Sequence, residues 1–153
     1  MIQRIQSVYL LIAVLMGVLC LSMQIGTFVT GDVEVVREFN LWISDGSGRH
    51  SFNTWPLFAI MLLSSAISLY AIFMYRNRML QARFCVFNVL LLVGWYILYA
   101  IYAHVLNVAP LAHISFHPSI PAAFPAISAI LLMMARHKIM TDEKLVRAAD
   151  RIR

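Results

Sequence analysis

Charged residues are scarce in this chain, and long stretches contain none. Of the 153 residues, 12 are Lys or Arg and 7 are Asp or Glu, so charged residues make up 12%, against about a quarter in a soluble domain. Hydrophobic residues make up 61%, and the mean hydropathy is +0.79. These values exclude an ordinary soluble domain. They predict an all-α membrane protein, a four-transmembrane-helix bundle that forms a single domain over residues 1–153.

Cysteine is equally scarce, which excludes a disulfide framework. Cys20 falls deep in the first apolar stretch, and Cys85 falls near the start of the third. Their expected depths differ by roughly 15 Å, whereas a disulfide needs Cα atoms within about 7 Å. We expect both cysteines to be small apolar fillers.

The apolar stretches also lack the residues that carry most membrane chemistry. They contain no Asp, Glu, Lys or Arg, and no Ser/His/Asp set or carboxylate pair falls at matching depth. No catalytic residue and no cofactor is therefore predicted, and an enzyme is the less favoured class. A transporter or channel needs an ionisable residue or a broken helix at mid-bilayer, and only Ser64, Ser65 and Pro125 approach that.

Basic residues are present, but they are concentrated on one side. Arg76, Arg78 and Arg83 separate the second and third apolar stretches, and a central arginine costs roughly 3 kcal/mol in a membrane. The loop 76–83 should therefore stay in the cytoplasm. Counted by side, the basic residues expected inside are Arg4, Arg76, Arg78, Arg83, Arg136, Lys138, Lys144, Arg147, Arg151 and Arg153, against Arg37 and Arg49 outside. The positive-inside rule predicts that both termini are cytoplasmic.

The four expected spans cover residues of about 8–29, 56–75, 84–105 and 120–135. The first competes with a secretory signal peptide, but its apolar run exceeds the usual length and no A-x-A site follows. Pro125 predicts a bend in the fourth span. Ser64 and Ser68 lie four residues apart on one face of the second span, and Asn88 in the third should find Ser68 or Tyr70 as a partner.

Residues 30–54 form the longest hydrophilic segment and should be extracytoplasmic. Apolar residues alternate there at Val33, Val35, Phe39, Leu41 and Ile43, and Asp45-Gly46-Ser47-Gly48 is typical of a turn. We therefore predict a small β-hairpin, which either caps the bundle or recognises a partner. Trp42 and Trp55 are expected at the outer interface of the membrane.

Aromatic and histidine side chains gather near the outer end of the third span. Trp95, Tyr99 and Tyr102 recur at helical spacing, which is typical of packing but would also suit the wall of a pocket for a flat ring. His104, His113 and His117 lie in or beside the predicted extracytoplasmic turn 106–119. With Trp95 and Tyr99, they are the weak candidates for a quinone or haem site, and no acidic or cysteine ligand nearby supports a metal.

The tail 136–153 is predicted to form a separate, amphipathic cytoplasmic helix with Thr141 as its N-cap. It should lie on the membrane or dock on a partner. The net charge of +5 fits anionic lipid headgroups rather than nucleic acid. The residues expected to contact lipid or a partner are Arg4, Arg76, Arg78, Arg83, Lys144, Arg147, Arg151 and Trp42.

The two ends of the chain, residues 1–10 (MIQRIQSVYL) and 142–153 (DEKLVRAADRIR), resemble the small membrane proteins of the Bacteroidetes catalogued as domain of unknown function 4293. The resemblance implies a multi-pass protein of a bacterial inner membrane with four helices. It brings no activity and no catalytic residue. Both matching segments are expected on the cytoplasmic face, so a shared role would lie there.

Three functions remain open at this point. The first is a non-enzymatic accessory or scaffold subunit that binds a protein partner, or further copies of itself, through its cytoplasmic ends or its outer hairpin. The second is a redox subunit that binds quinone or haem. The third is a small transporter or channel.

Overall fold

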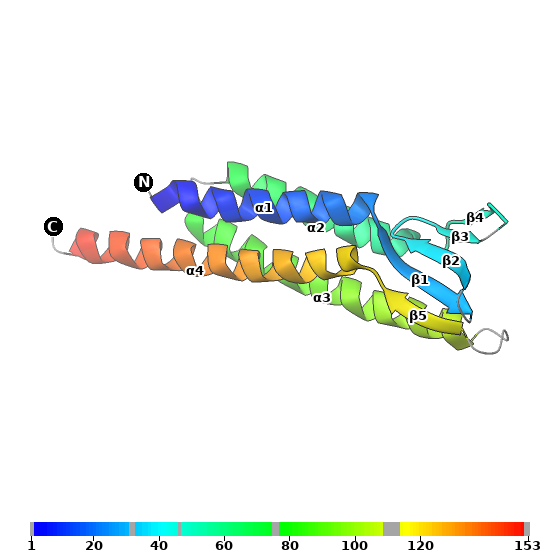
Figure 1. The fold of residues 1–153 in the computed structure, drawn as a ribbon. Helices are drawn as coiled ribbons and strands as arrows, with labels where there is room; N and C mark the ends of the chain where they lie inside the picture. Colours follow the sequence, from blue (N-terminus) through cyan, green and yellow to red (C-terminus); the bar gives the residue numbers. More distant parts are fainter. Residues whose placement is uncertain (1, 31–32, 46, 75–76, 109–113, 152–153) are drawn as a thin grey trace.

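The chain forms a long helical part with a small sheet at one end (Figure 1). The structure is a computed structural model that describes residues 2–30, 33–45, 47–74, 77–108 and 114–151. Its helices are α1 (Ile2–Ser22), α2 (Trp55–Phe73), α3 (Arg78–Val108) and α4 (Phe124–Arg151). Its strands are β1 (Gln24–Thr30), β2 (Val33–Phe39), β3 (Ile43–Asp45), β4 (His50–Ser51) and β5 (Ile114–Pro118), and a short 3₁₀ helix, η1 (Ile120–Ala123), precedes α4.

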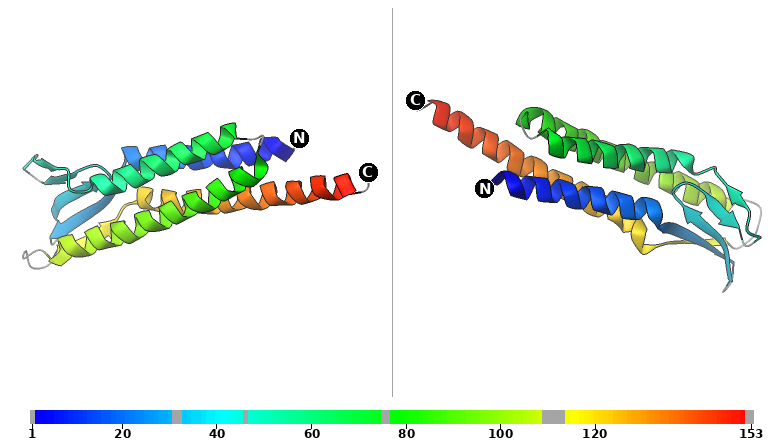
Figure 2. Two further views of the ribbon diagram at one scale, coloured as in Figure 1. Left: turned by 180° about the vertical axis from the view of Figure 1, so that it is seen from behind. Right: turned by 90° about the horizontal axis from the view of Figure 1, so that it is seen from above.

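The long helices pack side by side as a ring in which α1 and α3 each contact both α2 and α4. They run alternately toward and away from the sheet, so both ends of the chain lie opposite the sheet (Figure 1, Figure 2). Three of them contain a segment that is long and apolar enough to cross a membrane, namely Ile5–Ser22, Trp55–Phe73 and Arg78–His104, and a fourth such segment, Ile120–Val146, covers η1 and most of α4. The prediction of four such helices is confirmed.

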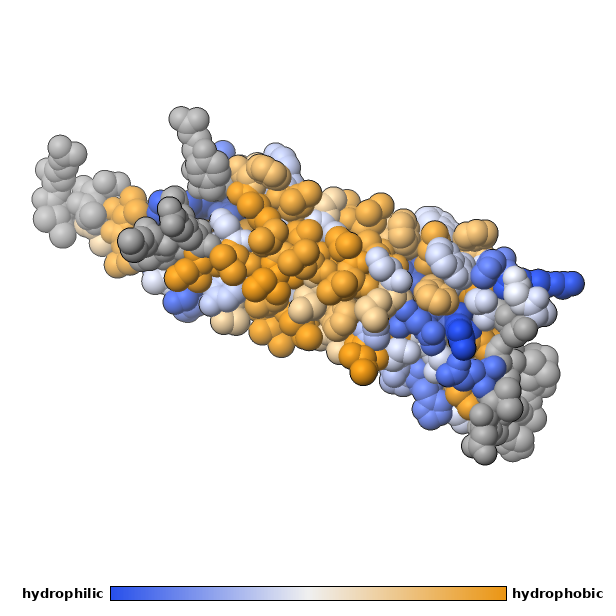
Figure 3. All heavy atoms as spheres, turned by 45° about the horizontal axis from the view of Figure 1, so that its top comes forward, coloured by the Kyte–Doolittle hydropathy of each residue, from blue (hydrophilic) through white to orange (hydrophobic). Residues whose placement is uncertain are grey.

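Apolar side chains cover the face of the helical part that Figure 3 shows, and they also fill its interior. Exposed examples come from all four long helices and include Leu15, Leu63, Leu90 and Ile130. Hydrophilic residues gather around the sheet in the same view. A helix of a water-soluble bundle is apolar on its inner face and polar on its outer face, so this surface differs from that of a soluble bundle.

The interior of the bundle contains a few polar side chains that join neighbouring helices. Asn88 on α3 is fully buried, and its Nδ2 donates to Ser68 Oγ (2.5 Å) and to the carbonyl of Ser64 (3.0 Å) on α2. The predicted pairing of Asn88 with Ser68 is therefore confirmed. Cys20 and Cys85 are both free and buried, as predicted.

The first helix begins and ends earlier than the span of 8–29 predicted from the sequence. It ends at Ser22, and Gln24–Thr30 forms a strand instead. The end of this run contains the β-branched residues Thr27, Val29 and Thr30, which favour a strand. Pairing decides the outcome, because β1 has a partner strand on each side, β2 and β5.

The extracytoplasmic hairpin predicted within 30–54 is part of a larger sheet. A β3–β4 hairpin does occur, with Ile43 opposite Ser51, but its neighbours β2, β1 and β5 extend the sheet to five strands. β1 comes from the end of the expected first span, and β5 comes from the segment 106–119 that was predicted to be a turn. The sheet therefore combines segments that lie almost a hundred residues apart.

The fourth helix is longer and more regular than predicted. It runs without interruption from Phe124 to Arg151, so the tail is not a separate helix. Thr141 is not an N-cap, since its Oγ1 donates to the carbonyl of His137 within α4 (2.9 Å). Pro125 lies in the first turn of α4, where the missing N–H costs no hydrogen bond, so the predicted bend has no cause there. No Gly or Pro follows Pro125, which explains why the helix continues.

Candidate functional site

The most elaborate site in the described structure is the junction between the sheet and the end of the bundle. The strands are ordered β4-β3-β2-β1-β5, and every pair is antiparallel. β1 follows α1 almost directly, and β5 leads through η1 into α4. The sheet is therefore attached to the bundle at several points along the chain (Figure 1).

Aromatic rings fill the space between the sheet and α3. The ring of Phe116 on β5 lies 4.9 Å from that of Phe28 on β1 and 5.6 Å from that of Tyr99 on α3, measured between centroids. Tyr99 in turn stacks on Trp95 at 5.1 Å. Gly26 leaves room for this cluster, because a Cβ there would lie 2.6 Å from the Phe116 ring.

A buried asparagine joins the sheet to two helices. Asn40, which follows β2, accepts a hydrogen bond from Trp95 Nε1 (3.0 Å) and donates from Nδ2 to the carbonyl of Cys20 in the last turn of α1 (2.7 Å). The side chains of Asn40 and Trp95 are both inaccessible to solvent. Since a buried polar group without a partner is costly, these hydrogen bonds fix the position of β2 against α1 and α3.

The tyrosines of the predicted aromatic stripe also bind the backbone of other elements. The hydroxyl of Tyr99 donates to the carbonyl of Ile25 on β1 (2.7 Å), and that of Tyr102 donates to Asn53 (2.9 Å). Tyr96, beside the stripe, donates to the carbonyl of Ala122 in η1 (2.7 Å). The stripe therefore holds the sheet and its connections to α3.

The structure does not assemble the predicted cofactor residues around one cavity. Trp95 and Tyr99 are buried against each other, whereas His104 and His117 are exposed. His117 neighbours Phe116 on β5, and successive strand residues point to opposite faces, so it points away from the aromatic cluster. His113 lies outside the described residues. Within the described part of the chain, no three His, Cys, Asp or Glu side chains could hold a metal ion.

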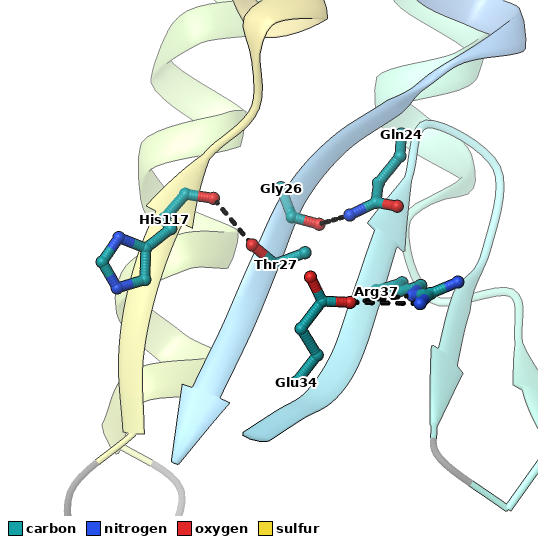
Figure 4. A network of polar contacts seen from close by, with 6 residues as sticks. All are labelled: Gln24, Gly26, Thr27, Glu34, Arg37 and His117. Atoms are coloured by element: carbon teal, nitrogen blue, oxygen red, sulfur yellow. Dashed lines mark hydrogen bonds and ion pairs between the residues drawn. The ribbon is translucent and has the colours of Figure 1, made fainter. Parts of the chain in front are cut away.

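The outer face of the sheet carries a row of polar residues, one from each strand. Register places them in the order His117, Thr27, Arg37, Ser44 and His50. The row is roughly 19 Å long, because strands lie about 4.8 Å apart. Arg37 forms an ion pair with Glu34 (3.1 Å), and Thr27 Oγ1 donates to the carbonyl of His117 (3.4 Å) (Figure 4). Beside the row, Gln24 Nε2 donates to the carbonyl of Gly26 (3.3 Å). We call His117, Thr27, Arg37, Ser44 and His50 the outer row.

Most of the residues predicted to contact lipid or a partner lie at the opposite end of the molecule. Arg83 and Lys144 are exposed there and Arg78 is partly exposed. Arg76 lies outside the described residues, as do the side chains of Arg4, Arg147 and Arg151. Trp42 lies at the sheet end, between the rings of Phe39 (5.4 Å) and His50 (6.1 Å).

Two residues of the junction were not singled out from the sequence. Asn40 has no local signal, because its partners lie on distant helices. Glu38 on β2 is fully buried, and neither carboxylate oxygen has a hydrogen-bond partner among the described residues. Burial raises the pKa of this carboxyl group from 4.5 to about 7. In the sequence, Glu38 lies next to Arg37, and an acidic residue beside a basic one gave no reason to expect this burial.

Comparison with known proteins gives a family but no activity. A protein-family model described as "Domain of unknown function (DUF4293)" matches residues 2–152. No curated protein matches the chain.

Proposed function

The chain belongs to the family described as domain of unknown function 4293, and we propose that it is a non-enzymatic membrane protein that presents its sheet to a protein partner. In this proposal the four long helices cross a bacterial inner membrane and the sheet lies on the outer side. The observation that carries the proposal is the contrast between the two surfaces. The helices expose apolar side chains, while the sheet exposes Arg37, His50 and His117 of the outer row.

The lengths of the helices support membrane insertion. A hydrocarbon core of about 30 Å needs about 20 residues of helix, and the apolar segments contain between 18 and 27 residues. Side chains such as Leu63, Leu90 and Ile97 are about half exposed or more. Lipid would cover this apolar surface, which in water would favour aggregation.

The distribution of charge supports the proposed orientation. Of the described basic residues, Arg78, Arg83, Arg136, Lys138 and Lys144 lie toward the end opposite the sheet, and only Arg37 and Arg49 lie at the sheet end. Lys and Arg are enriched on the cytoplasmic side of membrane proteins. This end, with both termini, is therefore proposed to be cytoplasmic, where the basic side chains would contact anionic headgroups.

The junction favours a rigid platform over a redox site. A quinone or haem pocket would need an open space beside Trp95 and Tyr99, but these rings stack on each other and both polar atoms bind protein groups. The same contacts hold the sheet in one orientation. A preorganised surface loses less conformational freedom when a partner binds, which suits an accessory or scaffold subunit.

The proposed orientation predicts the accessibility of introduced cysteines. In spheroplasts, a membrane-impermeant maleimide should label Ser47→Cys in the β3–β4 turn, whereas Lys144→Cys near the end of α4 should react only after permeabilisation. The native cysteines are buried and serve as the internal control. Labelling of both introduced cysteines from the same side would contradict the proposal.

Partner binding through the outer row can be tested with two charge reversals. Arg37→Glu changes an exposed residue of the outer row, and Lys144→Glu is the matched control at the other end of the molecule. Breaking the exposed Arg37–Glu34 pair should cost less than about 1 kcal/mol of stability. In the proposed complex, Arg37→Glu places a negative charge against the partner's group that pairs with Arg37, and such a like-charge contact costs several kcal/mol. We therefore expect Arg37→Glu to lower the recovery of a cross-linked partner from native membranes about tenfold or more.

The control decides between the two ends. Lys144→Glu should recover the partner as well as the wild-type protein does. If Lys144→Glu loses the partner and Arg37→Glu retains it, the binding surface lies at the tail instead. Recovery of only this protein and lipid from all three samples would contradict a partner-binding function.

A further inference from the structure

Glu38 is the most unusual titratable group in the described structure. It lies on β2, outside the four apolar helical segments, and its side chain is 0% exposed. Neither Oε1 nor Oε2 has a hydrogen-bond partner among the described residues. Oε2 lies 3.3 Å from the position that a Cβ on Gly26 would occupy, so the carboxyl group faces the interior of the junction.

No positively charged side chain among the described residues acts on Glu38. Across the sheet its neighbours are Gly26 on β1 and Ile43 on β3. From α3, Tyr99 is close enough to Glu38 for the two side chains to interact electrostatically, but its hydroxyl donates to the carbonyl of Ile25. From α1, Cys20 accepts hydrogen bonds from Asn40, two residues beyond Glu38, at its carbonyl oxygen (2.7 Å) and its Sγ (3.6 Å).

Apart from Glu38, the described charged side chains of β2 lie on the other face of the sheet. Arg37 is adjacent to Glu38 on β2 and therefore points outward, where it is paired with Glu34. The two described histidines of the sheet, His117 and His50, belong to the outer row and are exposed. None of these groups can neutralise a carboxylate in the junction without a rearrangement of β2.

We propose that Glu38 is a proton-binding site that makes attachment of the sheet to the bundle depend on pH. In its neutral form the carboxyl group is compatible with the buried position. In its charged form it needs water or a cation, because an unpaired buried charge is strongly disfavoured. Hydration requires β2 to separate from the bundle, which would break the hydrogen bonds of Asn40 to Trp95 and Cys20.

The direction of the pH dependence follows from the two protonation states. The attached form holds its proton up to a pKa of about 7, whereas a solvated glutamic acid loses it near 4.5. Between these values the attached form binds more protons than the detached form, so attachment weakens as pH rises. It is strongest below about 4.5, and the full penalty is present above about 7. Between about pH 4.5 and about pH 7, the equilibrium constant for detachment of the sheet, which we call the opening constant, should rise by up to tenfold per pH unit.

Hydrogen exchange of the β1 and β2 amides in the full-length protein, corrected for intrinsic exchange, measures this constant. For the wild-type protein in detergent micelles we expect the opening constant to rise about fortyfold between about pH 5 and about pH 7, because each pKa lies close to one end of this interval. Glu38→Gln, which imitates the neutral carboxyl group, should show no such rise. Glu34→Gln is the matched control on the same strand, because Glu34 is exposed, and it should behave like the wild type.

The same pH dependence in Glu38→Gln as in the wild type would overturn the proposal, as would a wild-type opening constant that does not change with pH. A second measurement uses only the wild-type protein, in case Glu38→Gln does not fold. The infrared carbonyl band of a protonated carboxylic acid should disappear with a midpoint near pH 7. Loss of all such bands with midpoints near 4.5 would overturn the proposal equally.

Discussion

Replacing Trp95 with alanine is expected to cost about 3–5 kcal/mol of unfolding free energy, the range for a large buried aromatic side chain. Trp95 is fully buried, stacks on Tyr99 and donates a hydrogen bond to Asn40. Its loss leaves a cavity and an unpaired Oδ1 on Asn40. Since proteins are stable by only about 5–15 kcal/mol, the melting temperature in mild detergent should fall sharply.

Trp55 is the matched control for this prediction. It is 61% exposed at the start of α2, so Trp55→Ala should change stability by no more than about 0.5 kcal/mol in detergent. Trp95→Phe tests the hydrogen bond apart from most of the ring packing, because it keeps an aromatic ring, although a smaller one, but removes the N–H. It should cost about 1–3 kcal/mol. A wild-type melting temperature for Trp95→Ala would show that the junction does not depend on this side chain.

Substituting Gly26 with valine is expected to cost about 1–3 kcal/mol or more, the usual cost of overpacking. A Cβ at Gly26 would lie 2.6 Å from Phe116 Cε2 and 3.3 Å from Glu38 Oε2. The ring of Phe116 has little freedom to move, because it lies between the rings of Phe28 and Tyr99. Chemical unfolding in micelles would measure the loss, and Gly26→Ala should have a smaller effect of the same sign.

Gly94 provides a control with the opposite sign. A Cβ at Gly94 on α3 would meet no atom within 4 Å, so Gly94→Ala should stabilise the protein by about 0.5–1 kcal/mol through helix propensity. Phe116→Leu should restore part of the stability of Gly26→Ala, since the two residues share one space. If Gly26→Ala and Gly94→Ala behave alike, the proposed collision does not occur.

The number and the approximate positions of the four long helices could be predicted from the sequence, because the relevant signals are local. Uncharged stretches with a basic residue near one end mark the four long helices, and depth limits the partner of Asn88 to Ser68 or Tyr70, of which the structure has Ser68. The turn at Asp45–Gly48 likewise predicts the β3–β4 hairpin. Each of these inferences uses residues that are neighbours in the chain, or a single coordinate along the helix axis.

The sheet could not be predicted in full because its pairing is non-local. The β-branched residues within Gln24–Thr30 favour a strand, but nothing local identifies its partner β5, which follows about 90 residues later. The side-chain orientation of β2 was also hidden. Alternation of Val33 and Val35 with polar residues suggests that odd-numbered residues face inward, but the register shifts between Phe28 and Val29. A shift of one residue reverses the faces, which brings Glu38 inward and leaves Arg37 outside.

The position of β1 between β2 and β5 has a consequence for the order of assembly during synthesis. β1 and β2 leave the ribosome early, whereas β5 emerges only after α3. Until then one edge of β1 has unpaired backbone groups, and such an edge can bind foreign strands. The nascent protein therefore passes through an interval in which a chaperone that shields strand edges would improve its yield, and this vulnerability ends when Ile114–Pro118 arrives.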